Sequence, residues 1–250
     1  MTHTSASTVQ LDKKLRALKL SGILDTLDLR LTQSKDDGLS YGEFLELLLE
    51  DELNRRADRK SKRLFKKAKL PFNKDLSDFD FSFQPSVNKK EILDLASLNF
   101  IEKKENIIFI GQPGTGKTHL SVALGVRALL RGYSVLFTTV WQMINNLTQS
   151  RADLSYQQKV KAYLKPDLLI LDELGYRSMA ESTVEDFFEI ITGRYEKGST
   201  IITSNRSFNE WDKVFLDKTL TSAIIDRLIH HCHNIMITGE SYRFKNRNKK

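Results

Sequence analysis

The fold of this chain is decided by one stretch, Ile107-Ile108-Phe109-Ile110-Gly111-Gln112-Pro113-Gly114-Thr115-Gly116-Lys117-Thr118. Its four leading apolar residues, three of them β-branched isoleucines, predict a buried strand. The strand runs into the pattern G-x-x-x-x-G-K-T, and a helical periodicity follows over residues 118–131. A strand, a glycine-rich loop and a helix in this order form the context of a phosphate-binding loop. The stretch therefore predicts a nucleotide-binding site.

The residue types in this loop have separate tasks in binding a triphosphate and its metal ion. Glycines let the backbone wrap an anion so that successive N–H groups point inward, and the helix N-terminus adds partial positive charge. We expect Lys117 to reach the β- and γ-phosphates and the Thr118 hydroxyl to hold Mg²⁺. A glycine-rich turn without function is the alternative, which the flanking strand and helix disfavour. The residues expected to contact ATP are Gly111, Gln112, Pro113, Gly114, Thr115, Gly116, Lys117, Thr118 and His119.

Length and composition are those of an ordinary soluble protein. The chain has 250 residues, of which 40% are hydrophobic and 28% charged. No apolar run approaches the ~18 residues that span a bilayer, and the polar residues 1–10 lack the apolar segment of a secretory signal. Cys232 is the single cysteine, which excludes an intramolecular disulfide and fits a reducing compartment. We therefore expect a cytoplasmic protein without a membrane partner.

The net charge of +7 is concentrated in two segments. Residues 54–69 hold nine basic residues and one acid, and residues 241–250 hold five basic residues and no acid. The rest of the chain is mildly acidic, so the two segments form an electrostatic footprint for a polyanion. A solvated helix face is the alternative for the first segment. The residues expected to bind double-stranded DNA are Arg55, Arg56, Arg59, Lys60, Lys62, Arg63, Lys66 and Lys67.

Residues 1–69 are expected to form a small helical domain. Apolar residues recur every three or four positions over residues 11–31, as in an amphipathic helix or a helix pair broken near Gly22. Ser40 and Glu43 then form an S-x-x-E capping box ahead of an apolar run. That second helix is expected to continue through the basic stretch to about residue 68, because Pro71 cannot continue it.

Residues 70–90 predict a linker that packs its aromatic residues on a second domain, residues 91–250. That domain alternates as α/β proteins do. Buried strands are expected at residues 107–110, 134–138, 168–171, 200–203 and 235–237. Helices are expected at residues 89–100, 118–131, 141–149, 156–164, 182–196 and 220–231. Five strands with intervening helices predict a five-stranded parallel sheet with helices on both faces.

Two of these strands end in residues suited to ATP hydrolysis. Asp172 can hold the Mg²⁺ coordination shell, and Glu173 can polarise an attacking water as a general base. Asn205 follows the strand 200–203 and could hydrogen-bond the γ-phosphate or that water. Ordinary solvated strand ends are the alternative in both places. The position of the two acids, after Lys117 in an alternating pattern, favours catalysis.

Together these motifs resemble the AAA+ ATPases, and within them the branch of the DnaC helicase loaders and the IstB transposition helpers. The matching segments are Gly-Thr-Gly-Lys-Thr-His at 114–119, Leu-Asp-Glu-Leu-Gly at 171–175, Thr-Ser-Asn at 203–205 and Phe-Asp-Phe-Ser-Phe-Gln-Pro at 79–85. The resemblance covers nearly the whole chain, including the leucine-rich first helices. On these segments the chain is identified as a member of the IstB family.

The resemblance implies an ATPase that binds DNA, assembles with ATP into a homo-oligomer and helps the cognate transposase of an insertion sequence to select its target. It implies that Arg227 is an arginine finger for a neighbouring subunit's ATP and that Arg243 is the second sensor. Only 13 residues follow Ile237, too few for a packed C-terminal helical lid, and the DnaC and IstB branch also lacks that lid. A DnaC-like replicative helicase loader is the alternative from the same branch. A P-loop kinase and a DNA scaffold with structural ATP are alternatives from other classes.

The run His230-His231-Cys232-His233 contains residue types that bind metals. Adjacent residues of a helix point in different directions, and the sequence has no second Cys or His pair to complete a tetrahedral site. We therefore expect no metal ion at this run.

Overall fold

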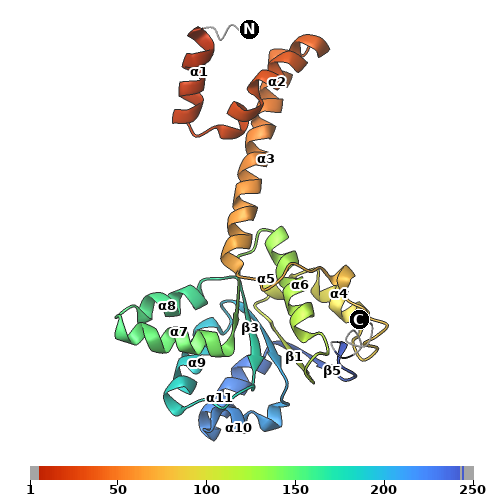
Figure 1. The fold of residues 1–250 in the computed structure, drawn as a ribbon, viewed down its shortest axis with the longest axis vertical. Helices are drawn as coiled ribbons and strands as arrows, with labels where there is room; N and C mark the ends of the chain where they lie inside the picture. The colour runs from red at the N-terminus through yellow and green to blue at the C-terminus, as the bar shows by residue number, and fades with distance from the viewer. Residues whose placement is uncertain (1–5, 243, 245–250) are drawn as a thin grey trace. The chain divides into compact units, whose positions relative to one another are not determined.

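The computed structural model describes residues 6–242 and 244, and the chain divides into two compact units, Met1–Arg63 and Leu64–Lys250. The second unit contains one sheet of five parallel strands in the order β2-β3-β4-β1-β5 (Figure 1). The predicted parallel sheet is confirmed, and each strand lies where the apolar runs placed it. The strands are β1 (Asn106–Gly111), β2 (Val135–Thr139), β3 (Leu168–Leu174), β4 (Ser199–Ser204) and β5 (Cys232–Ile237).

Successive residues of each strand point to opposite faces of the sheet, so the strands divide their side chains between two hydrophobic cores. Ile107 and Phe109 of β1 pack into a core with the helices of one face, whereas Ile108 and Ile110 pack into the core of the other face. The first face is covered by α4 (Lys89–Leu95), α5 (Asn99–Glu102) and α6 (Lys117–Leu130). The second is covered by α7 (Val140–Ala152), α8 (Tyr156–Leu164), α9 (Glu181–Arg194), α10 (Asp212–Phe215) and α11 (Lys218–Ile229).

One predicted helix of this unit is wrong in its extent. The segment expected to form a single helix over residues 89–100 forms α4 and α5, because Leu98 between them has φ +70°. A left-handed residue cannot continue a right-handed helix. The short α10 and the 3-10 turns η1 (Leu76–Asp78) and η2 (Phe208–Glu210) were not predicted, since so few residues show no period.

The segment 70–90 lies within the second unit and packs on its first core. Leu76 and Phe79 are buried there, and Phe81 is partly buried against the same core. The aromatic residues of this segment are therefore packed on the sheet domain, as the sequence predicts. Among the described residues, no helix combines the length and the apolar character needed to cross a membrane.

The first unit is helical, as predicted, with α1 (Ala6–Ala17), α2 (Ser21–Asp37) and the start of α3 (Tyr41–Ala68). The first two helices form a pair broken near Gly22, as one of the two expected arrangements has it, and the break itself falls at Lys19, with φ +57°. Gly22 lies inside α2, where a Cβ would be 2.6 Å from the Asp51 carbonyl oxygen, and its N–H donates to Glu52 at 2.6 Å. The predicted capping box is present, with the Ser40 N–H donating to Glu43 at 2.8 Å.

Candidate nucleotide-binding site

The phosphate-binding loop joins β1 to α6 and depends on glycine at two positions. Gly114 has φ +84° and Gly116 has φ +99°, conformations that residues with a Cβ rarely adopt. The loop is also closely covered, because a Cβ on Gly116 would lie 2.5 Å from the Phe79 ring and one on Gly114 would lie 2.0 Å from Ser241 Oγ. The backbone conformation and the close packing therefore both require glycine.

Lys117 is the first residue of α6, and its side chain is buried inside the loop. Its Nζ donates to the carbonyl oxygens of Gly111 at 2.6 Å and Gln112 at 2.8 Å. The ammonium is thus held where the loop N–H groups and the helix N-terminus concentrate positive charge. Phosphate oxygens are stronger acceptors for an ammonium than neutral carbonyls, so a bound phosphate can take over these hydrogen bonds.

The two residues predicted to hold Mg²⁺ are in direct contact. Thr118 Oγ1 donates to the two carboxylate oxygens of Asp172 at 3.0 and 3.1 Å. Asp172 is 5% exposed, and its Oδ1 accepts a second hydrogen bond, at 2.5 Å, from Thr203 Oγ1 on the neighbouring strand β4. The carboxylate is therefore fixed by two hydroxyls, and one of them belongs to a residue that the sequence analysis did not select.

Glu173 differs from Asp172 in both backbone and exposure. The pairing of β3 with β4 is irregular between Leu171 and Leu174, and Glu173 has φ +64° while its side chain is exposed. Its N–H donates to Thr203 Oγ1 at 3.0 Å. Residues in such sparsely populated conformations collect at functional sites. One hydroxyl thus orients both acids, and the Thr-Ser-Asn motif was the only sequence signal for it.

Asn205 directly follows β4 and is exposed. Its Oδ1 lies 3.4 Å from the position of a Cβ on Gly175, the residue that follows β3. In the sheet order, β4 lies between β3 and β1, so Asn205 is at the same edge as Glu173 and the loop. The structure therefore gathers the predicted residues of three strands at one end of the sheet.

A cavity of about 290 Å³ opens beside the loop, and aromatic residues form much of its wall. Phe72, Phe79 and Phe83 come from segment 70–90 and Tyr242 from the C-terminal end of the chain, opposite loop residues 114–119. Phe83 and Tyr242 meet edge to face, with ring centroids 5.2 Å apart. An aromatic-walled cavity at a phosphate-binding loop suits a nucleotide base. From the sequence, the aromatic residues of segment 70–90 were expected only to pack on the sheet domain.

His119 forms part of that wall in its neutral state. Burial lowers the pKa of the imidazole, an effect opposed by the hydrogen bond to the Asp75 carbonyl oxygen, which lies 3.2 Å from Nε2. The Phe79 ring meets the imidazole edge to face at 5.5 Å. His119 therefore joins segment 70–90 to the loop and offers an uncharged surface to the cavity.

The structure does not bring Arg227, to which the resemblance gives the role of arginine finger, into this site. Arg227 lies on α11, where Nη1 donates to the Ala223 carbonyl oxygen at 2.9 Å and the guanidinium stacks over Phe188 of α9 at 4.9 Å. Arg243 lies outside the described residues. The Tyr242 N–H, just before it, donates to the Gly114 carbonyl oxygen at 3.0 Å.

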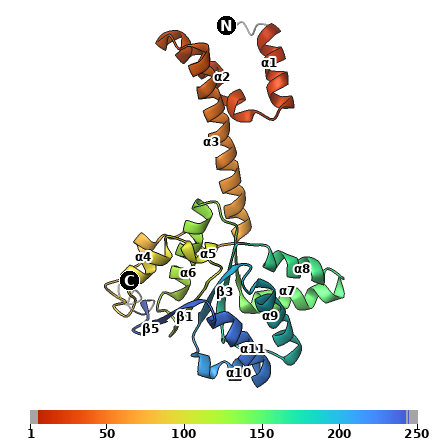
Figure 2. The ribbon, with the colours of Figure 1, turned by 180° about the vertical axis from the view of Figure 1, so that it is seen from behind.

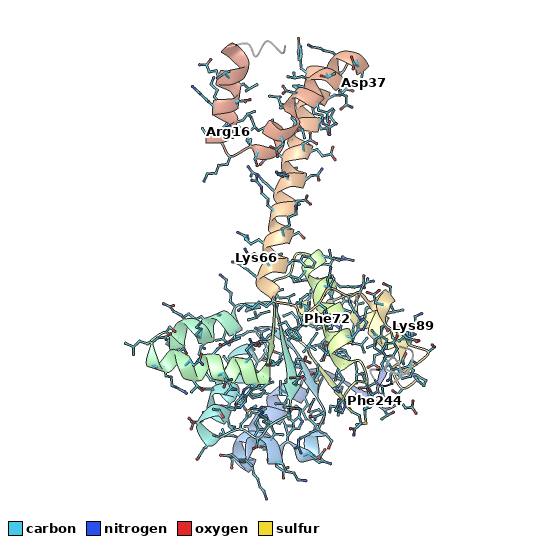
Figure 3. All side chains as sticks on the ribbon, viewed as in Figure 1. Arg16, Asp37, Lys66, Phe72, Lys89 and Phe244 are labelled. Atoms are coloured by element: carbon cyan, nitrogen blue, oxygen red, sulfur yellow. The ribbon has the colours of Figure 1, made fainter. Side chains whose placement is uncertain are left out.

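The predicted DNA-binding residues are exposed along α3, on which Figure 3 labels Lys66. Two of them have acidic partners that the composition of residues 54–69 did not reveal. Arg55 pairs with Asp25 of α2 at 2.8 Å, and Arg56 pairs with Glu52 at 2.7 Å. Within the described part of the chain, the remaining six form no ion pair; they are Arg59, Lys60, Lys62, Arg63, Lys66 and Lys67.

The parallel sheet, the loop and the acids of β3 define a P-loop ATPase fold of the AAA+ class. The chain belongs to the family of IstB-like ATP-binding proteins, whose sequence model matches residues 13–250. It is 40% identical over 240 residues to the ATP-binding protein of insertion sequence IS21 from Pseudomonas aeruginosa, covering 96% of this chain and 91% of that protein.

Two solved structures illustrate the similarity in fold. The replication initiator DnaA, bound to AMPPCP and single-stranded DNA, is similar with a TM-score of 0.57 and 26% identity, over 72% of this chain and 55% of that one. DnaI is similar with a TM-score of 0.57 and 24% identity, over 66% of this chain and 90% of that one. The family and fold expected from the sequence are therefore confirmed.

Proposed function

We propose that this chain is an Mg²⁺-dependent ATPase that assembles on double-stranded DNA and assists the transposase of an insertion sequence. The observation that carries the ATPase part is the hydrogen-bonded set Thr118, Asp172, Thr203 and Glu173 beside Lys117. In this set the carboxylate of Asp172 is buried, whereas that of the next residue, Glu173, is exposed. Separate environments are what metal binding and water activation need.

The residues at this set fit Mg²⁺ by their chemistry. Thr118 and Asp172 offer only oxygen atoms, which are the ligands that Mg²⁺ prefers. Held there, Mg²⁺ would neutralise negative charge on the phosphates. Lys117 holds the phosphate oxygens, and Glu173, which is exposed, accepts a proton from the attacking water. Asn205 is placed at the same edge to orient that water or the γ-phosphate.

The aromatic cavity supports ATP as the ligand of this loop. Phe79 and Phe83 with Tyr242 offer flat apolar surfaces on which a purine can stack. His119, with its neutral imidazole, extends that surface toward the loop. The remaining loop residues are proposed to contact the phosphates through their backbone.

The DNA and transposase parts rest on the basic face of α3 and on the relatives. The family members are ATP-binding proteins of insertion sequences, and one protein with this fold was solved with single-stranded DNA. Arg227, assigned as an arginine finger, points to a homo-oligomer in which each site is completed by a neighbour. The second candidate is a helicase loader, because the chain shares its fold with the DnaC helicase loader.

Two variants test the ATPase proposal directly. Lys117→Ala should abolish ATP binding, whereas Glu173→Gln should bind ATP with Mg²⁺ and lose turnover. ATP affinity and hydrolysis are measured for both, with the exposed Glu181→Gln as a matched control. If Glu173→Gln hydrolyses ATP at the normal rate, Glu173 is not the general base. A transposase gene beside the gene of this chain would favour the transposition helper over the loader.

A further inference from the structure

A second cluster of ligating side chains lies away from the nucleotide site. Glu196, His230 and His231, which we call the His–Glu cluster, each offer one ligand atom, and these atoms lie within 4.8 Å of one another. His231 Nε2 is 3.8 Å from Glu196 Oε1, and the two imidazole rings have centroids 4.1 Å apart. All three residues are exposed, so an ion from solution can reach them.

The fold brings these residues together through the ends of two helices. The helix α9 ends at Arg194, and Glu196 follows in a left-handed turn with φ +56°. The helix α11 ends at Ile229, so His230 and His231 lie just beyond it. The two helices pack side by side (Figure 2). Helix C-termini carry partial negative charge, which favours a cation at this point.

The cluster also has a partner that orients one of its rings. The hydroxyl of Tyr195 lies 2.8 Å from His230 Nδ1. In a metal-bound form Nδ1–H donates to that hydroxyl oxygen, and Nε2 is left for the ion. Such a hydrogen bond to the second nitrogen is the usual arrangement for a histidine that binds a metal.

We propose that the His–Glu cluster binds a divalent transition-metal ion of the Zn²⁺ type, held by two imidazoles and one carboxylate. This donor set suits Zn²⁺, with a water as the fourth ligand. Tetrahedral ligands around Zn²⁺ lie roughly 3.3 Å apart, so small rotations of exposed side chains close the site. The ion would clamp the end of α9 to the end of α11.

The site is distinct from the nucleotide site and does not depend on the proposed function. The cluster lies where β4 and β5 begin, since Ser199 and Cys232 are their first residues, whereas the nucleotide site lies where the strands end. From the sequence no metal ion was expected here, because adjacent residues of a helix point in different directions and no second Cys or His pair completes a tetrahedral site. The structure supplies Glu196 from a distant segment instead.

Untagged, metal-stripped protein without nucleotide tests the proposal, using Zn²⁺ in calorimetry and Co²⁺ as a spectroscopic probe. We expect one site with tetrahedral Co²⁺ absorption. His230→Gln, His231→Gln and Glu196→Gln should each weaken Zn²⁺ binding at least tenfold. His233→Gln is the matched control from the same run, because His233 pairs with Glu105 at 2.9 Å and should retain binding.

Amide exchange locates the ion independently of affinity. Zn²⁺ should slow exchange in peptides that cover the ends of α9 and α11, and Asp172→Asn should leave that protection intact. The proposal is overturned if the double variant His230→Gln/His231→Gln binds Zn²⁺ as tightly as the wild type. Protection at β3 that is lost in Asp172→Asn would overturn it too, since the ion would then occupy the nucleotide site.

Discussion

The two units of this chain hold polar groups in different ways. In the unit Leu64–Lys250 they are buried and shared, as at Arg194, which is 2% exposed and donates to five backbone carbonyls and to Thr200. Desolvation lowers the pKa of Arg194 to about 10, so it remains charged at pH 7. In the unit Met1–Arg63, four residues form the buried core, and most charges are exposed around it, with Glu52 as the buried exception at 4% exposure; the core residues are Leu15, Ile23, Leu27 and Leu48.

This difference matches what each unit is proposed to do. Phosphoryl transfer needs groups fixed to fractions of an ångström, which buried and shared hydrogen bonds provide. Attraction to a phosphate backbone needs only exposed positive charge. Substitutions of buried, hydrogen-bonded groups at the nucleotide site should cause large losses of ATPase activity that depend on geometry. Substitutions of exposed basic residues should cause smaller and more additive losses of DNA affinity.

The largest effect is expected at Arg227. Arg227→Ala should leave ATP binding nearly intact and reduce hydrolysis about 10³-fold, because an arginine finger stabilises charge in the transition state. Steady-state ATPase rates and nucleotide affinity measure this, with the exposed Arg131→Ala as the control. Mixing Arg227→Ala with Lys117→Ala should restore some activity if the finger acts across an interface. No rescue at any mixing ratio would indicate a structural role on Phe188.

Thr203 should show an intermediate effect that depends on its hydroxyl. Thr203→Val keeps the shape but removes the hydrogen bonds to Asp172 and from the Glu173 N–H. Loss of a group that orients a metal ligand typically costs 10- to 100-fold in metal affinity or activity. We expect a lower kcat and a higher Mg²⁺ concentration for half-maximal rate. Thr203→Ser should restore both, and an equal loss in Val and Ser variants would contradict the role.

The sheet and the loop could be predicted because each depends on residues that are adjacent in the sequence. Four apolar residues identify β1, and the glycine pattern that follows identifies the loop. Thr203 could not be assigned in this way, since its role depends on the irregular pairing that turns Glu173 outward. The aromatic cavity was missed for a similar reason, because Phe83 and Tyr242 are far apart in the sequence and meet only in the fold.

The basic segment shows the same limit for charges. Its composition counts one acid, Asp58, yet the partners of Arg55 and Arg56 are Asp25 on another helix and Glu52, just before the segment. The structure therefore distinguishes the basic residues that form an ion pair from those that do not, a difference that the composition of the segment does not show. Those without an ion pair among the described residues should contribute more to DNA binding.

DNA affinity tests that division. Replacing Arg59, Lys60, Lys62 and Arg63 with Gln should weaken binding about tenfold on unrelated duplexes. It should also flatten the plot of log affinity against log salt, by up to about 0.9 per lost phosphate contact. Arg55→Gln/Arg56→Gln is the matched control and should have a smaller effect per residue. If the four substitutions leave affinity and slope unchanged, this face of α3 is a solvated surface or docks a protein.

The smallest effect should come from the ion pair that supports the small helical core. Arg30 of α2 binds Asp51 of α3 through two hydrogen bonds of 2.8 Å. Hydrogen bonding to Arg30 lowers the pKa of Asp51 from 3.8 to about 2. A carboxylate with a lowered pKa stabilises the folded unit above its unfolded pKa, and the contribution is lost as the pH falls toward the folded one.

Asp51→Asn should therefore loosen the helical unit at pH 6 and matter progressively less between pH 4 and pH 2. A partly exposed ion pair such as Arg30–Asp51 contributes about 1 kcal/mol or less to the free energy of unfolding. Exchange of amides in α2 and α3 should therefore become a few-fold faster in the variant. Comparing wild type and variant at the same pH cancels the pH dependence of exchange itself.

Asp28→Asn on α2, whose carboxylate forms no ion pair with a described residue, is the control. If the Asp51→Asn difference is as large at pH 3 as at pH 6, the side chain acts through its shape and not its charge. ATP binding should be unchanged in this variant, because its effect belongs to the helical unit alone.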